Sequence, residues 1–333
     1  MAELVFVGCY TGDAGNGTGI TTFSRSPSGA LEEVGSLPLE SPSWLVRHPS
    51  LPVLYAANET SAGAVTALSW DASGALSVLG TAETGGAHPC HLAVTPDGRF
   101  LLCANYTGGS LAVFSLSASG SVESRTALVQ HSGRGPDPDR QEAAHVHMAV
   151  PGPSIVSAVD LGTDEIRSYT LTSSGGLAPL AVSSLPPGTG PRQLVRRPGT
   201  DLAYVVGELA GTLVTVRETS PGAFSVVSTT SSTFSPPSEP NLVAHLELTG
   251  SRMYVSNRGP DCVTEFALDD AAAVADQPCG ANPRHFALVD GTCYVAAQSE
   301  DAITAFTLTA SGEAELRYYP TGSPTFVLPV SST

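Results

Sequence analysis

Short apolar stretches that end in a polar residue recur along the whole chain, at a spacing of roughly 40 to 50 residues. Residues 52–57 (PVLYAA), 99–104 (RFLLCA) and 202–207 (LAYVVG) are examples. Their β-branched and aromatic side chains are typical of strands. The polar residues that end the seven stretches are Tyr10, Asn58, Asn105, Asp160, Glu208, Asn257 and Gln298. The even spacing predicts one supersecondary unit repeated seven times.

A second stretch, which alternates between apolar and polar residues, follows each of these polar ends. Residues 65–68 (VTAL) and 303–306 (ITAF) show the alternation, which places one face of a strand in a core. Turn signals such as Asp97-Gly98 and Ser73-Gly74 separate the stretches. Four short strands fit each unit, and no apolar stripe of helical period competes with them. The pattern therefore predicts an all-β, seven-bladed β-propeller with four antiparallel strands per blade and almost no helix.

The two ends of the chain predict how the ring closes. Residues 323–330 (SPTFVLPV) resemble the first strand of a unit, whereas residues 4–8 (LVFVG) resemble a second strand. One blade then takes one strand from the C-terminus and three from the N-terminus, which leaves no exposed edge. No linker or change of composition divides the sequence, so we expect residues 1–333 to form a single domain.

The composition agrees with a compact β protein. Hydrophobic residues make up 41% and charged residues 14% of the chain. The sequence has no apolar run of about 18 residues and no basic signal-peptide head, so we expect a cytoplasmic protein. The 6 cysteines follow no metal-binding or redox spacing, and most fall within predicted strands. We expect them to be buried free thiols.

The formal net charge of −16 argues against nucleic-acid and anionic-membrane partners, whose binding relies on basic surface. All 15 basic residues counted as Lys plus Arg are arginine. Coding bias explains part of this, so the positions of the arginines are more informative than their number.

Several charged residues fall where the blades meet the central channel. In an antiparallel blade, the first strand starts and the second strand ends on the same face of the disc. Side chains at these two places therefore converge around the mouth of the channel. The charged or titratable side chains among them are His91, His147, Arg192, Glu208, Arg258 and Arg284. The set predicts a pocket at the mouth.

Each of these residues also has a structural interpretation. A lone arginine at a strand start commonly pairs with a carboxylate, and His91 or His245 can be a hydrogen-bonded core histidine. His145 and His147 flank Val146, so a period of two places both on one face, and we favour His147 as the catalytic one. The polar strand ends, Asn105 among them, are expected mainly to satisfy backbone groups.

Two further features bear on the pocket. Residues 133–142 (GRGPDPDRQE) form a polar insertion that either covers the channel mouth, bringing Arg140 into the pocket, or is a solvated surface loop. His145 and His147 with Glu142 or Asp160 could ligate a metal, but no spacing identifies the remaining ligands, so we expect no metal. No phosphate-binding glycine loop or Gly-x-Ser-x-Gly elbow is present, which argues against nucleotide use and serine-hydrolase chemistry.

Five stretches carry a family resemblance: 88–106 (HPCHLAVTPDGRFLLCANY), 140–150 (RQEAAHVHMAV), 188–195 (GTGPRQLV), 205–209 (VVGEL) and 254–259 (YVSNRG). In combination they resemble the seven-bladed propeller lactonase family, which includes propeller-type 6-phosphogluconolactonases and the fungal carboxymuconate cyclase. The resemblance implies that a pocket opens or closes a lactone ring on a small anionic substrate without a cofactor.

By position, the resemblance implies a catalytic set of His147, Arg192, Glu208 and Arg258. The residues His91, His145, Arg284, Asn105 and Arg140 remain as substrate-binding candidates. Arginine can hold a carboxylate or phosphate with two parallel donors, and histidine can exchange protons near neutral pH. In the hydrolytic hypothesis, His147 activates water, Arg192 and Arg284 hold the anionic group, and Arg258 with Glu208 forms the oxyanion side.

Three functions remain open at this point. They are a lactonase acting on a sugar lactone such as 6-phosphogluconolactone, a cyclase that forms a lactone from a carboxylated muconate, and a propeller that binds a ligand or protein without catalysis. Arginine, histidine and glutamate at one mouth favour an enzyme, since protein-binding surfaces more often carry aromatic anchors.

Overall fold

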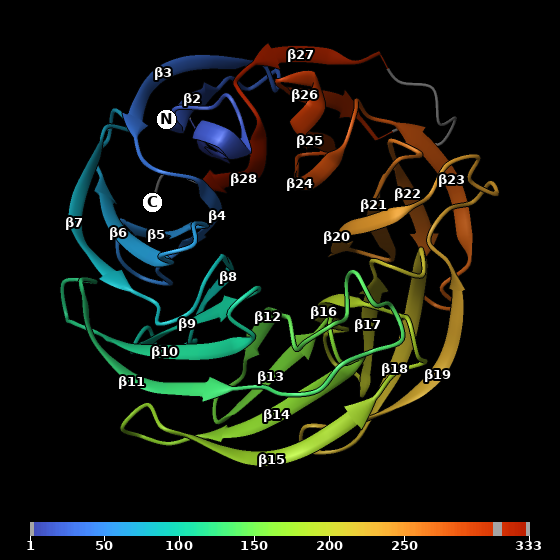
Figure 1. Ribbon diagram of the computed structural model, residues 1–333. Coiled ribbons are helices and arrows are strands. Elements are labelled where there is room, and N and C mark those ends of the chain that lie inside the picture. The colour runs from blue at the N-terminus through green and yellow to red at the C-terminus, as the bar shows by residue number, and fades with distance from the viewer. Residues whose placement is uncertain (1–2, 309–314, 331–333) are drawn as a thin grey trace.

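Seven four-stranded antiparallel sheets surround a central axis (Figure 1). The computed structural model describes residues 3–308 and 315–330, which form 28 strands. The helices of these residues are two single 3-10 turns, η1 (Gly12–Ala14) and η2 (Gln298–Glu300), neither long and apolar enough to cross a membrane. The predicted all-β, seven-bladed propeller is confirmed.

We number the blades in chain order. Blade 1 contains β4 (Pro42–Arg47), β5 (Val53–Asn58), β6 (Ala64–Trp70) and β7 (Leu76–Glu83). Blade 2 contains β8 (Pro89–Val94), β9 (Phe100–Asn105), β10 (Ser110–Leu116) and β11 (Val122–Gln130). Blade 3 contains β12 (Val146–Pro151), β13 (Ile155–Asp160), β14 (Glu165–Leu171) and β15 (Leu177–Ser184). Blade 4 contains β16 (Pro191–Arg196), β17 (Leu202–Gly207), β18 (Thr212–Ser220) and β19 (Ala223–Ser231).

The remaining blades follow the same plan. Blade 5 contains β20 (Leu242–Thr249), β21 (Arg252–Arg258), β22 (Cys262–Ala267) and β23 (Ala273–Pro278). Blade 6 contains β24 (Pro283–Val289), β25 (Thr292–Ala297), β26 (Ala302–Thr307) and β27 (Arg317–Pro320). Blade 7 contains β28 (Pro324–Val330), β1 (Glu3–Cys9), β2 (Gly19–Arg25) and β3 (Leu31–Pro38).

Blade 7 closes the ring as the sequence predicts. Its innermost strand, β28, comes from the C-terminal end and pairs antiparallel with β1, with Val7 opposite Val327. The strands β1, β2 and β3 complete the sheet, and the two chain ends lie in the same blade (Figure 1). Both edges of β1 are therefore hydrogen-bonded, which removes a free inner edge.

The hydrophobic core lies between the faces of neighbouring blades. The second strands β5, β9 and β25 are buried along their whole length, whereas outer strands such as β7 alternate between exposed and half-buried residues. Tyr55 of blade 1 packs in one cluster with Leu101 and Phe114 of blade 2, and its hydroxyl donates to the Gly120 carbonyl at 2.7 Å. All 6 cysteines lie within the described residues and are buried free thiols, as expected.

A buried polar network joins blades 2 and 3. Asp160 is fully buried and accepts hydrogen bonds from the backbone N–H groups of His145 (2.8 Å) and Gly162 (3.1 Å). Its second oxygen lies 2.7 Å from Nδ1 of His131, whose Nε2 is 2.8 Å from the Tyr169 hydroxyl. Asp160 therefore stabilises the chain directly before β12.

The first strand of every blade has a β-bulge near its start. In β12, Val146 pairs with Asp160 and Met148 pairs with Val159, so His147 has no residue opposite it. In β16 the same shift leaves Arg192 unpaired between Pro191 and Gln193. The bulged residues of blades 1 to 7 are Ser43, Cys90, His147, Arg192, Ala244 with His245, Arg284 and Thr325. A bulge re-aims a side chain.

The ladder registers also correct the predicted series of polar strand ends. Asn58, Asn105, Asp160 and Asn257 pair with the residue just before the bulge of their own blade. In the other three blades that position is Cys9, Gly207 and Ala297. Tyr10, Glu208 and Gln298 thus lie one residue further along. The sequence series combined two structural positions, because apolar residues occupy the first one in three blades.

We predict that Asp160→Ala lowers the free energy of unfolding by about 3–5 kcal/mol, because it leaves buried N–H groups and His131 without their acceptor. Chemical denaturation measures the loss. The matched control is Asp201→Ala, which removes an ion pair with Arg217 whose two side chains are 48% and 50% exposed. That change should cost less than about 1 kcal/mol. Equal losses for the two variants would contradict the structural role of Asp160.

Candidate active site

Two rings of side chains line one mouth of the central channel. One ring consists of the bulged residues of the innermost strands. The other consists of the residue one beyond the strand-end position, namely Tyr10, Glu59, Tyr106, Leu161, Glu208, Arg258 and Gln298. The start of each first strand and the end of the second lie on the same face of the disc, so both rings lie at the same end of the channel. The site therefore contains side chains from several blades.

Glu208 is the centre of one half of the site. Its side chain is 4% exposed, and Arg140 donates to Oε1 at 2.7 Å. Nη1 of Arg192 lies 3.3 Å and Nη2 of Arg258 lies 3.0 Å from Oε2. Burial alone raises the pKa of Glu208, but the charges of Arg258, Arg192 and Arg140 hold it far below its usual range. Glu208 is therefore ionised and holds three guanidinium groups together.

Arg192 links Glu208 to His147. Its Nε donates to the Ala244 carbonyl at 2.8 Å, and its Nη1 donates to Nε2 of His147. Burial, followed by the charge of Arg192, holds the pKa of His147 well below its usual range. The imidazole is therefore neutral at pH 7. A guanidinium can only donate, so Nε2 is the acceptor and Nδ1 carries the proton.

Nδ1 of His147 has no hydrogen-bond partner among the residues that the structure describes, and Nη2 of Arg258 forms the 3.0 Å ion pair with Glu208 without the geometry of a hydrogen bond. Arg258 is fixed at its other end, where Nε donates to the Leu242 carbonyl at 3.0 Å. Burial lowers the pKa of Arg258 to about 10, although Glu208 acts in the opposite direction. Arg258 remains a cation at neutral pH and is held between the Leu242 carbonyl and Glu208.

The insertion over the mouth contributes Arg140. Besides Glu208, Arg140 contacts the Tyr106 hydroxyl at 3.2 Å, and its side chain is 37% exposed. The Tyr106 ring stacks on His145 and meets His147 edge-on, with centroid distances of 4.5 and 5.7 Å. His145 also contacts Glu142 at 3.1 Å. Arg140 thus bridges Glu208 and Tyr106, and His145 stacks on the Tyr106 ring.

A second polar group occupies the mouth on blades 6, 7 and 1. The Tyr10 hydroxyl donates to Oε1 of Glu59 at 2.9 Å and accepts a hydrogen bond from Nη2 of Arg284. The Arg284 guanidinium also lies over the Tyr10 ring, 4.9 Å from its centroid. Arg284 is therefore grouped with Tyr10 and Glu59 rather than with Glu208. The pKa values of Arg192 and Arg258 are lowered mainly by burial, and the charge of Arg284 lowers them further.

Deeper in the channel, the residues that follow the bulges pack against one another and against His245 of the two-residue bulge in blade 5. Trp44 contacts His91 and Phe326 at centroid distances of 4.3 and 4.4 Å, and His245 contacts His285 at 3.8 Å. Burial lowers the pKa values of His91 and His245 to about 3, so both are neutral. His91 forms part of this aromatic layer below the mouth.

Asn105 does not join the other candidates. It is fully buried, its Nδ2 donates to Ser110 of the same blade at 3.0 Å, and its oxygen accepts from Cys103. It fits the strand-end role also expected for it. The sequence reasoning did not assign Tyr10, Glu59 and Tyr106 to the site, although they occupy the ring position of Glu208. Correct alignment of the seven units would have identified them.

The mouth is positively charged within an acidic protein. Arg140, Arg192, Arg258 and Arg284 face Glu59 and Glu208, a formal balance of +2, whereas the whole chain carries −16. Such a local field favours a small anion. The histidine and carboxylate residues of the metal alternative do not converge, because Glu142 contacts His145, Asp160 contacts His131, and His147 contacts Arg192.

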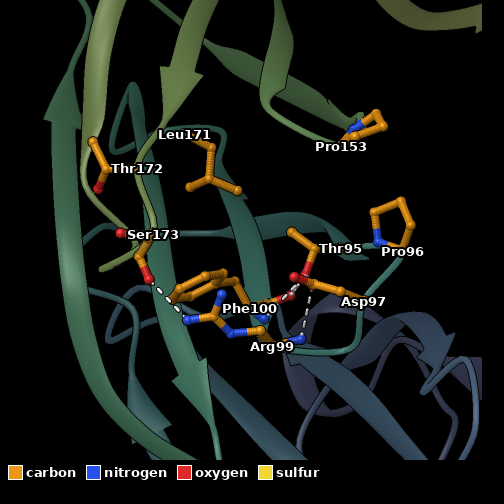
Figure 2. Close-up of a pocket in the computed structure, with 9 residues that line it drawn as sticks. All are labelled: Thr95, Pro96, Asp97, Arg99, Phe100, Pro153, Leu171, Thr172 and Ser173. Atoms are coloured by element: carbon orange, nitrogen blue, oxygen red, sulfur yellow. Dashed lines mark hydrogen bonds between the residues drawn. The ribbon is translucent and has the colours of Figure 1, made fainter.

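A separate pocket of about 370 Å³ lies between blades 2 and 3 on the opposite face of the disc (Figure 2). It is lined by the β8–β9 and β14–β15 turns and by Pro153, and Arg99 donates to the Ser173 carbonyl at 2.8 Å across it. None of the mouth residues lines this pocket.

The fold is a seven-bladed propeller with a cluster of arginines around the buried Glu208, and comparisons with known proteins assign its family. Residues 4–329 match the family described as "Lactonase, 7-bladed beta-propeller". A 6-phosphogluconolactonase from Bacillus subtilis is 33% identical over 275 residues, covering 79% of this chain and 77% of the relative. One from Formosa agariphila is 26% identical over 305 residues, covering 85% and 86%.

Solved structures agree. A periplasmic gluconolactonase from Pseudomonas aeruginosa superposes with a TM-score of 0.91 at 27% identity, covering 99% of each chain. A protein from Lactobacillus plantarum superposes with a TM-score of 0.90 at 26% identity, covering 99% of this chain and 100% of that one. The chain belongs to the seven-bladed β-propeller lactonase family, and it is a lactonase, a hydrolase of cyclic esters.

We predict that the His147 imidazole stays neutral at pH 6.5, where a histidine in a free peptide is half protonated. Nitrogen-15 NMR of the ring should show a neutral Nδ1–H tautomer with shifts unchanged between pH 8 and pH 6. The signal is assigned by its loss in His147→Gln, and a histidine-containing peptide is the control. Titration of this ring near pH 6.5 would contradict the burial and the contact with Arg192.

Proposed function

We propose that this lactonase hydrolyses a small anionic sugar lactone, with 6-phosphogluconolactone as the candidate substrate, at the channel mouth. The observation that carries the proposal is the neutral His147 in contact with Arg192, beside a buried glutamate that gathers three arginines. The names of the Bacillus subtilis and Formosa agariphila relatives point to the same substrate. The positive mouth suits the phosphate of such a lactone.

The anionic group is held by Arg192 and Arg284, which come from the bulges of blades 4 and 6. A guanidinium presents parallel donors to phosphate or carboxylate and stays charged throughout the working pH range. Arg140, on the partly exposed insertion, adds a donor at the rim. These contacts fix the lactone carbonyl beside His147.

His147 is the general base. In the free protein its Nε2 accepts a hydrogen bond from Arg192. When the substrate anion takes the donors of Arg192, the lone pair of Nε2 becomes available to a water molecule. That water loses a proton to Nε2 as its oxygen attacks the lactone carbonyl. The low pKa keeps the lone pair unprotonated at neutral pH.

Arg258 stabilises the oxyanion. Its guanidinium is fixed by the hydrogen bond from Nε to the Leu242 carbonyl and by the ion pair of the buried Nη2 with Glu208, which lacks the geometry of a hydrogen bond. Preorganised donors of this kind stabilise charge that develops in a transition state. The tetrahedral intermediate then collapses, the ring C–O bond breaks, and the leaving alkoxide takes the proton from His147. Lactone and water yield one hydroxy acid.

The fold and cysteines also suit the cytoplasm, which we retain as the proposed compartment. Six buried free thiols are compatible with reducing surroundings. The substrate is the only partner that the proposal requires.

We predict that the wild-type protein hydrolyses 6-phosphogluconolactone and that Arg192→Ala lowers kcat/KM by about 100-fold or more, because the anion clamp and the His147 contact are both lost. Arg192→Lys keeps the positive charge but loses the two parallel N–H donors of the guanidinium, so it should recover only part of the activity. The control Arg217→Ala, on an exposed ion pair, should retain full activity.

Initial rates above spontaneous hydrolysis measure the effect, and circular dichroism checks that each variant is folded. Carboxymuconate is assayed in parallel. Wild-type protein that is inert towards lactones, or unchanged activity in folded Arg192→Ala, would contradict the proposed mechanism. Muconate cyclisation without lactone hydrolysis would instead favour the lactone-forming alternative.

A further inference from the structure

The group formed by Tyr10, Glu59 and Arg284 has no role in the chemistry above except for the anion contact of Arg284. Its residues occupy the same two rings as the catalytic set, so they open on the same mouth. Arg284 is a bulged residue, like His147 and Arg192. Tyr10 and Glu59 occupy the ring position of Glu208. This group therefore lies at the same end of the channel as Glu208.

Unused hydrogen-bonding atoms concentrate here. Oε2 of Glu59, Oγ of Ser43 and Oγ1 of Thr325 are buried and have no partner within residues 3–308 and 315–330. Ser43 and Thr325 are 4% and 2% exposed, and both are bulged residues of the blades that carry Glu59 and Tyr10. Buried polar atoms without partners carry a free-energy cost, which a ligand with matching groups removes.

The chemistry of these atoms favours hydroxyl groups over a second anion. Glu59 is an acceptor, with Oε1 engaged by the Tyr10 hydroxyl and Oε2 free. The charge of Arg284 is already shared with Glu59, whose Oε2 lies 4.0 Å away. A hydroxyl can donate to Oε2 and exchange hydrogen bonds with the serine and threonine. A carboxylate in the same place would be repelled by Glu59.

We infer that Glu59, with Ser43 and Thr325, is the specificity-determining group that binds the hydroxyl-bearing carbons of a polyhydroxylated substrate and rejects polycarboxylates. The inference rests on the proposed function for the position of the anion, and it adds the reason for preferring a sugar lactone to a muconate. The two halves of the mouth then divide the substrate, with the Glu208 side taking the reacting end and Glu59 the polyol.

The test compares two phosphorylated acids that differ only in hydroxyl groups, with a dicarboxylate as the third ligand. Isothermal titration calorimetry measures the binding of 6-phosphogluconate, 6-phosphohexanoate and cis,cis-muconate to the full-length protein. The wild type should bind 6-phosphogluconate more tightly than 6-phosphohexanoate. Glu59→Gln should weaken 6-phosphogluconate about 10- to 100-fold and leave 6-phosphohexanoate within about threefold. The same variant should bind cis,cis-muconate more tightly than the wild type does.

Two further variants keep the test decisive. Ser43→Ala removes one hydroxyl contact and should weaken 6-phosphogluconate about 2- to 10-fold, which gives an independent measure if Glu59→Gln folds poorly. Glu265→Gln, which changes a glutamate of the third strand β22 paired with Arg252, should bind all three ligands as the wild type does. A purely structural role for Glu59 would weaken all ligands together, whereas the inference requires effects of opposite sign.

The inference is overturned if the wild type shows no preference for the hydroxylated ligand, or if Glu59→Gln weakens all three ligands equally. Binding is measured without turnover, so the result is separate from the lactonase assay. A hydroxyl preference that depends on Glu59 in a protein without lactone hydrolysis would contradict the proposed function but support this inference. Lactone hydrolysis without a hydroxyl preference would support the proposed function and contradict this inference.

Discussion

The β-bulge at the start of each innermost strand is the constraint on which the site depends. It leaves one residue per blade outside the ladder, and in blades 3, 4 and 6 that residue is His147, Arg192 or Arg284. In a regular strand these side chains would follow the alternation that buries their neighbours between blades. Seven repeated bulges instead produce a ring of side chains at the mouth, above an aromatic layer that includes Trp44 and His91.

The mouth combines ionic groups that would be costly to bury singly. Glu208 is nearly fully buried, and it is stabilised as an anion by three arginines from blade 4, blade 5 and the insertion. Glu208 in turn holds the N–H donors of those arginines at fixed positions. Donors held in this way can stabilise negative charge that develops in a transition state without moving first. The same field and burial keep His147 neutral. The contacts of Glu208 with the three arginines therefore both hold the mouth together and set the charges within it.

Sequence reasoning recovered most of the fold because the repeat is strong. Strand alternation, glycine turns and the complementary chain ends predicted seven blades and the closure of blade 7. It also placed Arg192, Glu208 and Arg258 together, and it left Arg140 open between this group and a surface loop. It missed the one-residue offset of Tyr10, Glu208 and Gln298, because Cys9, Gly207 and Ala297 break the polar series at the equivalent position. Residues such as Glu59 were therefore not assigned to the site.

The sequence alone determined the number of blades, the topology and the types of side chain that meet at the mouth, since hydrophobic periodicity and turn chemistry are local properties. Only the tertiary structure decided which of those side chains touch. Arg284 joined Tyr10 and Glu59, His145 stacked behind Tyr106, and Asn105 turned into its own blade. The first two outcomes depend on bulge geometry and on contacts between blades, with Arg284 and Tyr10 separated by 274 positions, and no local pattern encodes them.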